Sequence, residues 1–411
     1  MEWKKENRDT VLAKYLFLLI NPILAFVTAF ATIKTKSSFN ILFLLSIVFG
    51  ISFTVPIMET TNNSLDGIRY RRAFENYEVT SSTKYIQSTL YEDDIDFFDD
   101  ILYSSLGKIT DNYHILFMVL AIIMSFFMLK SLKIFVLNDN FKISIVSFIL
   151  LYVFLSNQIF NINVYRWFIA LWITVYSLLN IFLYKKKKYY LLLFLTPFIH
   201  SSYFVLYLFL LFYLIFSEKE KFLGIVLIIS LVFSFIPEYL IDNMRNLANY
   251  FPQAISNKIL AYTSEEYMYL INESGSGFIW VRRLLENLSV LYITLLVYIM
   301  HRNYKTNIEH TNCKHLYIFL LIVTIFVNFT IDIPSLGSRF IMLTLPLIAY
   351  IWLSCFSVQK YNIWVYGLGI LFVISAVFPV LLFPHLLYYL KVLEPLFFIN
   401  SPVVSFVMNL I

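Results

Sequence analysis

The chain has 411 residues, of which 60% are hydrophobic, 19% are aromatic and only 14% are charged. A soluble domain of this length cannot bury so much apolar surface, so the composition excludes a soluble globular protein. Its net charge of +5 comes from lysines in short polar segments. The sequence has no basic stripe with interleaved aromatic residues, which is the pattern that would indicate a nucleic-acid partner. Repeated apolar runs of about 20 residues predict an all-α, polytopic protein in the lipid bilayer.

The N-terminal half predicts four transmembrane helices, at roughly 11–31, 39–57, 113–129 and 141–160. A polar segment, residues 58–112, separates the second helix from the third. Lysines prefer the cytoplasmic side of a membrane, and they occur at the other ends of these helices: Lys34, Lys36, Lys130 and Lys133. We therefore place 58–112 outside as a first outer loop, which also places the N-terminus outside.

The stretch Asn161–Ser202 sets the orientation of the remaining chain. One apolar span leads from Arg166 to the lysine block 185–188, so Arg166 faces outside if the lysines face the cytoplasm. The following run, 189–216, is too long for one upright helix and too short for two full ones. The positive charges farther along favour a pair of short helices that bends near His200. Because irregular backbone within a membrane must line protein or a wet cavity, we expect a cavity there.

The C-terminal half predicts the other spans, which brings the total to about twelve in one integral membrane domain, residues 1–411. A second outer loop, residues 237–279, contains apolar residues three to four apart, from Ile241 to Phe251. This spacing predicts an amphipathic helix on the membrane surface. No internal repeat is evident, which disfavours the common transporter folds.

Four arginines occur at the predicted outer ends of helices: Arg166, Arg282, Arg283 and Arg339. The planar guanidinium suits two-point recognition of phosphate, so together these residues indicate a diphosphate site. The alternative is that each arginine reaches the lipid headgroups independently.

His200, followed by Ser201 and Ser202, is a candidate for binding a polar substrate or transferring its proton. A hydrogen-bonded core histidine is the equal alternative. Three carboxylates of the acidic first loop, Asp66, Asp94 and Asp96, are candidates for a general base or for holding a divalent metal, although most charge runs are solvated surfaces. No complete metal-ligand set and no nucleotide-binding motif appears, so we expect no metal and no cofactor.

Three short motifs resemble the EpsG-type exopolysaccharide polymerases, relatives of the Wzy O-antigen polymerases. The first is Asn161 followed by Arg166 at the entry to a span that ends in lysines. The second is Phe198-Ile199-His200-Ser201-Ser202, which is similar to the family's Phe-x-His-x-Ser element. The third is Asp66-Gly67-Ile68-Arg69-Tyr70 in the first outer loop. One position differs from the family, because Trp167 stands where glutamine is common.

This resemblance implies a GT-C-like glycosyltransferase of the bacterial cytoplasmic (inner) membrane. It would join undecaprenyl-diphosphate-linked oligosaccharide repeats into exopolysaccharide, capsule or O-antigen at the outer leaflet. The catalytic residues would be His200, Arg166, Asp66, Asp94 and Asp96. The substrate-binding residues would be Arg166, Arg282, Arg283, Arg339, Ser201, Ser202, Asn161 and Tyr70. The expected partners are the growing polysaccharide and a chain-length regulator and flippase of the same pathway. The alternatives are an O-antigen ligase-like enzyme, an acyl transferase or, in another class, a lipid-linked oligosaccharide flippase or transporter.

Overall fold

The computed structural model describes residues 2–54, 66–77, 97–156, 159–233, 279–331, 336–382 and 401–410, together with 245–246, 248–250, 256, 260, 264 and 333. The side chains of residues 159–160, 233, 279–280, 282–283 and 375–382 are outside this description. So are Asp94, Asp96 and nearly all of the second predicted outer loop, 237–279, including most of the proposed surface helix.

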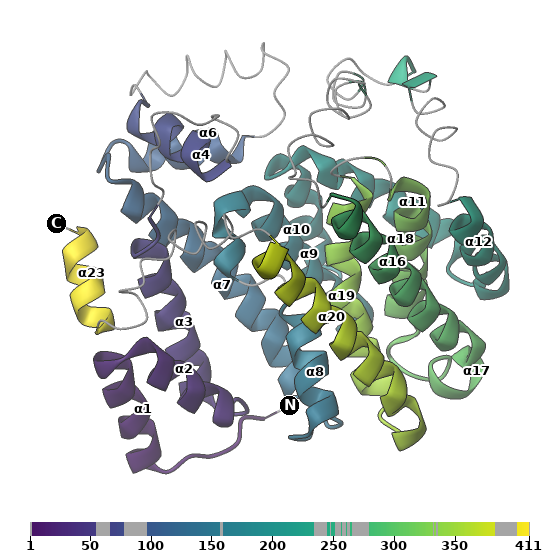
Figure 1. The fold of residues 1–411 in the computed structure, drawn as a ribbon, viewed down its shortest axis with the longest axis horizontal. Helices are drawn as coiled ribbons and strands as arrows, with labels where there is room; N and C mark the ends of the chain where they lie inside the picture. Colours follow the sequence, from purple (N-terminus) through teal and green to yellow (C-terminus); the bar gives the residue numbers. More distant parts are fainter. Residues whose placement is uncertain are drawn as a thin grey trace.

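The regular elements of the described chain are helical (Figure 1). They are α1 (Arg8–Ile20), α2 (Pro22–Ala31), α3 (Lys36–Ile51), α4 (Asp66–Glu75), α6 (Phe98–Leu106), α7 (Tyr113–Val136), α8 (Ile145–Phe154), η1 (Ile159–Val164), α9 (Tyr165–Tyr184), α10 (Tyr189–Leu195), η2 (Thr196–Phe198), η3 (Ser201–Phe204), α11 (Val205–Phe216), α12 (Glu220–Phe233), α16 (Ile279–Arg302), α17 (Tyr304–Asn307), α18 (Lys314–Thr330), α19 (Gly337–Cys355), η4 (Gln359–Tyr361), α20 (Asn362–Leu382) and α23 (Pro402–Leu410).

Four helical segments of the described residues are long and apolar enough to cross a membrane: 113–136, 161–184, 284–302 and 337–355. The prediction of an all-α membrane protein is therefore confirmed in its coarse form. Six further apolar helices are shorter, with 10–17 residues. The predicted fourth span is one of these, since α8 has only 10 residues where the sequence predicted a helix over 141–160. The count of about twelve spans stays a prediction.

The predicted first span is wrong, because residues 11–31 form two short helices instead of one. Asn21 is extended (φ −155°, ψ 130°), and its side chain accepts hydrogen bonds from the backbone N–H groups of Ile23 and Leu24. Pro22 occupies the first turn of α2, where its missing N–H costs nothing. Asn21 is thus both the end of α1 and the N-cap of α2, and the two helices pack against each other and against α3 (Figure 1).

This helix pair returns the N-terminal segment to the end of the bundle that carries lysines. The Lys133 ammonium lies 4.9 Å from the Trp3 ring centroid, and the Lys4 N–H donates to the Lys34 carbonyl at 2.9 Å. The sequence placed Lys34 and Lys133 inside but the N-terminus outside. That placement of the N-terminus is wrong relative to these lysines, because the first apolar run folds back on itself.

A buried ion pair fixes α1 to the start of α3. Lys14 is 2% exposed, and its ammonium pairs with Glu6 and donates to the hydroxyls of Thr35 (3.0 Å), Ser37 (2.9 Å) and Ser38 (2.9 Å). Burial alone would raise the pKa of Glu6, but hydrogen bonds from Lys14 and Ser37 outweigh it and hold that pKa below the ordinary 4.5. Each polar group therefore depends on the others for its partner.

We expect Lys14→Met to lower the free energy of unfolding by about 3–5 kcal/mol, because it leaves a buried carboxylate without its cation. Thermal unfolding in detergent measures this loss, and Lys36→Met, at an exposed lysine nearby, is the control. The pKa of Glu6 is depressed, so its stabilisation is present above pH 4.5 and is lost as the pH falls below that value. Equal stability of the two variants would contradict the proposed role of Lys14.

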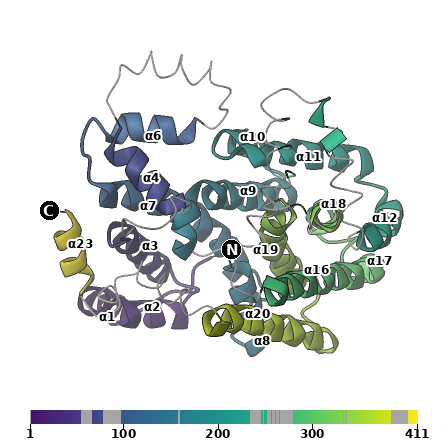
Figure 2. The ribbon, with the colours of Figure 1, turned by 45° about the horizontal axis from the view of Figure 1, so that its top comes forward.

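Helix α9 belongs to the most buried of the four candidate spans, since 83% of the apolar stretch within residues 161–184 is buried. It packs against α7, α10, α18 and α19, and Figure 2 shows it in the middle of these elements. On one side, α7 lies very close to α3, where a Cβ added to Gly50 would stand 2.5 Å from the Ala121 Cβ. Such close backbone approach is typical of helix pairs in membranes. Helix α9 is therefore held by several elements at once.

The predicted bend at His200 is present. Residues 189–216 form α10 and α11, joined by two short 3₁₀ segments, η2 and η3, and His200 between them is extended (φ −151°, ψ 116°). Pro197 lies in η2, where it cannot donate the N–H that a continuous helix needs. The interruption brings His200 to the N-terminal end of α9.

Candidate functional site

Three consecutive residues at the start of α9 organise the site: Tyr165, Arg166 and Trp167. Successive helical side chains point about 100° apart, so the three face different neighbours. Tyr165 is fully buried and Trp167 is 2% exposed, whereas the Arg166 side chain is 19% exposed. A short 3₁₀ segment that contains Asn161 leads into this turn.

Arg166 is held by α4 and α6, two helices that lie within the predicted first outer loop. Its Nε donates to the Tyr70 hydroxyl at 3.3 Å and lies 3.4 Å from the Asp99 Oδ2. The guanidinium carbon lies 5.4 Å from the centroid of the Tyr70 ring. Tyr70 is 5% exposed and the Asp99 side chain 15%. Arg166 is thus a partly buried cation whose direction is set by two partners.

Asp99 is in turn held by the phenol of Tyr165, which contacts a second phenol, that of Tyr103. Tyr165 donates to the Asp99 Oδ1 at 2.5 Å, and the hydroxyls of Tyr165 and Tyr103 are 3.0 Å apart. Burial, together with the Asp99 charge, raises the pKa of Tyr103. Burial also raises the pKa of Tyr70, although Arg166 acts in the opposite direction. The phenols of Tyr103 and Tyr70 therefore stay protonated at neutral pH and serve as neutral hydrogen-bonding groups.

Trp167 connects the other parts of the site. Its ring lies edge-to-face with the His200 ring, with 5.4 Å between the ring centroids. The Arg339 guanidinium carbon lies over the Trp167 ring, 5.8 Å from its centroid. The rings of Phe340 and Tyr203 pack on the Trp167 ring, with centroid distances of 5.2 and 4.6 Å. The Tyr203 hydroxyl donates to the Trp167 carbonyl. Its indole N–H is buried and has no hydrogen-bond partner among the described residues. A buried donor without a partner is costly, so this N–H is a candidate ligand contact.

His200 also caps η3. The Ser202 N–H donates to its Nδ1 at 3.3 Å, and the Ser202 hydroxyl is 2.6 Å from the same nitrogen. With Nδ1 as the acceptor, the proton of the neutral ring is on Nε2. Ser201 begins η3 directly after His200. His200 therefore combines a local structural contact with a second nitrogen that is suited to donating a hydrogen bond.

The anion site that the sequence predicted stays a prediction. The structure places Arg166 beside Tyr70, and it places His200 and Arg339 on the ring of Trp167, the residue that follows Arg166 in α9. Asp66 begins α4 and pairs with the largely exposed Arg69 at 2.8 Å. Arg282 and Arg283 lie in the first turns of α16, but their side chains are outside the described residues. Asp94 and Asp96 are outside them as well.

Sequence reasoning missed Asp99, Tyr103, Tyr165 and Trp167. A usable signal existed for two of them, because Asp99 and Tyr103 are four residues apart and share one face of α6. In the sequence, nothing distinguishes Tyr165 and Trp167 from the ordinary aromatic residues of a membrane boundary. Their burial is set by packing against distant elements, so the local sequence does not reveal it.

Two cavities of the described structure lie at the opposite, lysine-bearing end of α9. The expected cavity near His200 thus stays a prediction. Among the described residues, no group of three or more His, Cys, Asp or Glu side chains is placed to hold a metal ion. The chemical groups near the start of α9 are guanidinium, imidazole, phenol and indole, together with the Asp99 carboxylate. The first four kinds of group bind oxyanions and sugar hydroxyls.

Comparison with known proteins gives one result. The profile of the EpsG family matches residues 41–392. No curated protein and no solved structure matches the chain. The matched region includes α4, α6, α9, the His200 bend and the start of α19.

Proposed function

Since the chain belongs to the EpsG family, we propose that it is a glycosyltransferase that polymerises lipid-linked oligosaccharide repeats in a membrane. The donor would be a repeat unit on polyprenyl diphosphate, with undecaprenyl as the lipid. An acceptor hydroxyl attacks the anomeric carbon of the donor, and the bond to polyprenyl diphosphate breaks. The product is exopolysaccharide, capsule or O-antigen lengthened by one repeat.

The observation that carries this proposal is the contact of His200 and Arg339 with the ring of Trp167, the residue that directly follows Arg166 in α9. Negative charge develops on the leaving diphosphate, and fixed cations offset it without having to reorganise. Arg339 has no ion pair with a described carboxylate and rests on an aromatic face, so its guanidinium is suited to the diphosphate. The His200 Nε2 proton and the Trp167 indole proton supply neutral donors beside it.

In this proposal Arg166 acts at the sugar end of the leaving diphosphate. Its Nε is occupied by Tyr70 and Asp99, which aim the planar group instead of leaving it to move in water. Arg282, Arg283, Ser201, Ser202 and Asn161 are proposed as further substrate contacts. The general base is proposed to be a carboxylate of the acidic first loop, with Asp66, Asp94 and Asp96 as the candidates.

The arrangement in the membrane follows from the same assignment. We propose that the Arg166 end of α9 faces the outer leaflet of a bacterial cytoplasmic membrane, with residues 58–112 and 237–279 as outer loops. About twelve crossings in a GT-C-like arrangement would enclose the lipid-linked donor. A chain-length regulator and a flippase of the same pathway are the proposed partners.

Reconstitution of the full chain with a polyprenyl-diphosphate-linked repeat tests the reaction. We expect a ladder of glycans that differ by one repeat, with one polyprenyl diphosphate released for each bond formed and no requirement for nucleotide. Gel analysis of the glycans and extraction of the lipid measure the two products.

The alternatives give different products in the same vesicles. A flippase would move the labelled lipid between leaflets without forming a ladder. An O-antigen ligase-like enzyme would transfer glycan to another acceptor without extending the repeat, and an acyl transferase would leave the diphosphate bond intact. Any of these results would contradict the polymerase proposal.

A further inference from the structure

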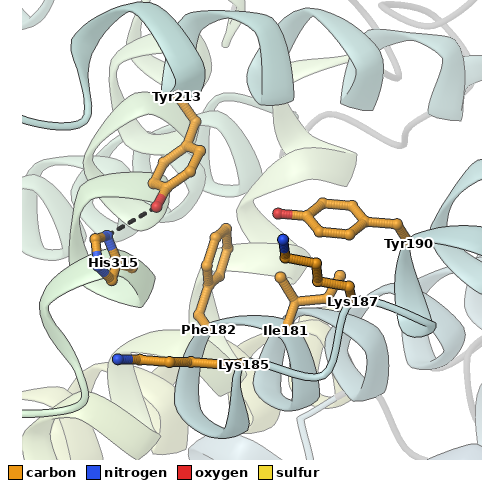
Figure 3. A pocket seen from close by; sticks show the side chains of 7 residues that line it. All are labelled: Ile181, Phe182, Lys185, Lys187, Tyr190, Tyr213 and His315. Atoms are coloured by element: carbon orange, nitrogen blue, oxygen red, sulfur yellow. Dashed lines mark hydrogen bonds between the residues drawn. The ribbon is translucent and has the colours of Figure 1, made fainter.

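A second polar site lies at the far end of α9. A cavity of about 240 Å³ is lined there by Lys185, Lys187, Tyr190, Tyr213 and His315, with Phe182 between them (Figure 3). Helix α9 has 20 residues and so spans about 30 Å. The cavity is therefore separate from the site around Arg166, and the proposed polymerase reaction does not use it.

The lining has positive charge and hydrogen-bond donors but no carboxylate. The Tyr213 hydroxyl and the His315 Nδ1 are 2.8 Å apart on one side of the cavity. Lys187 and Tyr190 also line the cavity, and Figure 3 shows them across from His315. The nearby carboxylate of Glu218 pairs with Lys314 at 2.7 Å, so its charge is largely offset. Such a lining favours an anion.

Lys185 provides an independent observation. It is the C-cap of α9 and adopts the left-handed conformation (φ 55°, ψ 30°), which is unique among the non-glycine residues that the structure describes. Glycine is the usual residue at this position of a helix end, because a Cβ is unfavourable there. A lysine in this backbone conformation, with its side chain along the cavity, indicates that the side chain has a use.

We propose that this cavity binds a phosphate group, carried by an anionic lipid headgroup or by a soluble phosphate ester. Lys185 and Lys187 supply the charge, and the hydroxyls of Tyr190 and Tyr213 supply hydrogen bonds to the phosphate oxygens. Phe182 provides an apolar wall for the carbon skeleton attached to the phosphate. Basic pockets between helices at the lysine-rich side of a membrane protein are a recurrent form of lipid recognition.

Native mass spectrometry of the full chain in neutral detergent tests the site, with phosphatidylglycerol as the lipid probe and glycerol 3-phosphate as the soluble one. We expect Lys187→Ala and Lys185→Gly each to weaken phosphatidylglycerol binding by about fivefold. Lys185→Gly is especially informative, because glycine accepts the same backbone conformation. Its thermal stability should equal or exceed that of the wild type, so weaker binding would not reflect unfolding.

The lysine block offers matched controls. The ammonium groups of Lys186 and Lys188 lie over the rings of Tyr184 and Tyr189 and do not line the cavity. Lys186→Ala and Lys188→Ala remove the same charge and should leave binding unchanged. Loss restricted to Lys185 and Lys187 supports the site, and the probe that shows it identifies the source of the phosphate. Equal losses in all four variants, or equal binding of phosphatidylcholine and phosphatidylglycerol, would overturn it.

Discussion

Replacing Arg166 by alanine is expected to slow polysaccharide chain extension by about 10²- to 10³-fold, because the reaction loses a preorganised cation near the leaving diphosphate. Cells with this variant should accumulate single lipid-linked repeats on the outer leaflet. Extraction of these lipids, with gel analysis of surface polymer, measures both consequences. The size of the effect follows from geometry, since Asp99 and Tyr70 already fix the Arg166 side chain.

Two further variants separate charge from shape at this position. Arg166→Lys keeps the positive charge but loses the planar fork, so we expect activity between that of the alanine variant and the wild type. Arg302→Ala removes an exposed arginine at the C-terminal end of α16 and should leave polymer length unchanged. Intact polymer in Arg166→Ala cells would refute the assignment. Repeats trapped on the cytoplasmic side would indicate a flippase instead.

The parts of the candidate site that the sequence predicted depend on local properties of the chain, namely the free-energy cost of inserting an ionisable residue into a membrane and the length of an apolar run. Arg166 and His200 are site candidates from the sequence because an ionisable residue beside a long apolar run is expensive to insert into a membrane. The bend at His200 was found because the run 189–216 has the wrong length for one helix. Both signals depend on chain length and polarity, and neither requires knowledge of distant contacts.

The parts that could not be predicted depend on how separate segments pack. Asp99 is one of eleven acidic residues in the first loop, and only the docking of α6 on α9 brings it to Arg166 and Tyr165. The aromatic face under Arg339 likewise comes from Trp167, which lies far away in the sequence. Composition alone cannot rank these eleven carboxylates, because each has the same charge until the fold places one of them beside Arg166.

The wrong first span has a different origin. Hydropathy averages over a window, and residues 11–31 remain apolar on average across Asn21 and Pro22. The local signal was nevertheless present, since asparagine followed by proline is typical of a helix N-terminus. If the helix-capping residues are identified first and the hydrophobic spans afterwards, the sequence predicts α1 and α2 as two helices. It then also places Lys4, Lys5 and Arg8 on the same side as Lys34, which agrees with the positive-inside rule.

His200→Ala and His200→Asn are both expected to slow chain extension by about 10²- to 10⁴-fold, the usual contribution of a group that transfers or donates a proton. The pair distinguishes chemistry from structure. His200 caps η3 through Nδ1, and asparagine is a good substitute for a capping acceptor, whereas alanine is not. We therefore expect the Asn variant to unfold at the wild-type temperature and the Ala variant to lose about 1 kcal/mol of stability.

The decisive comparison is the activity of the folded Asn variant. Asparagine has no counterpart of the Nε2 proton in the same direction, so an inactive but stable Asn protein assigns His200 to the substrate. His310→Ala, at an exposed histidine of the loop before α18, controls for loss of an imidazole elsewhere and should retain full activity. If His200→Asn restores long polymer, the residue is a cap alone. In that case the proton donors near the diphosphate reduce to Arg166, Arg339 and the buried indole of Trp167.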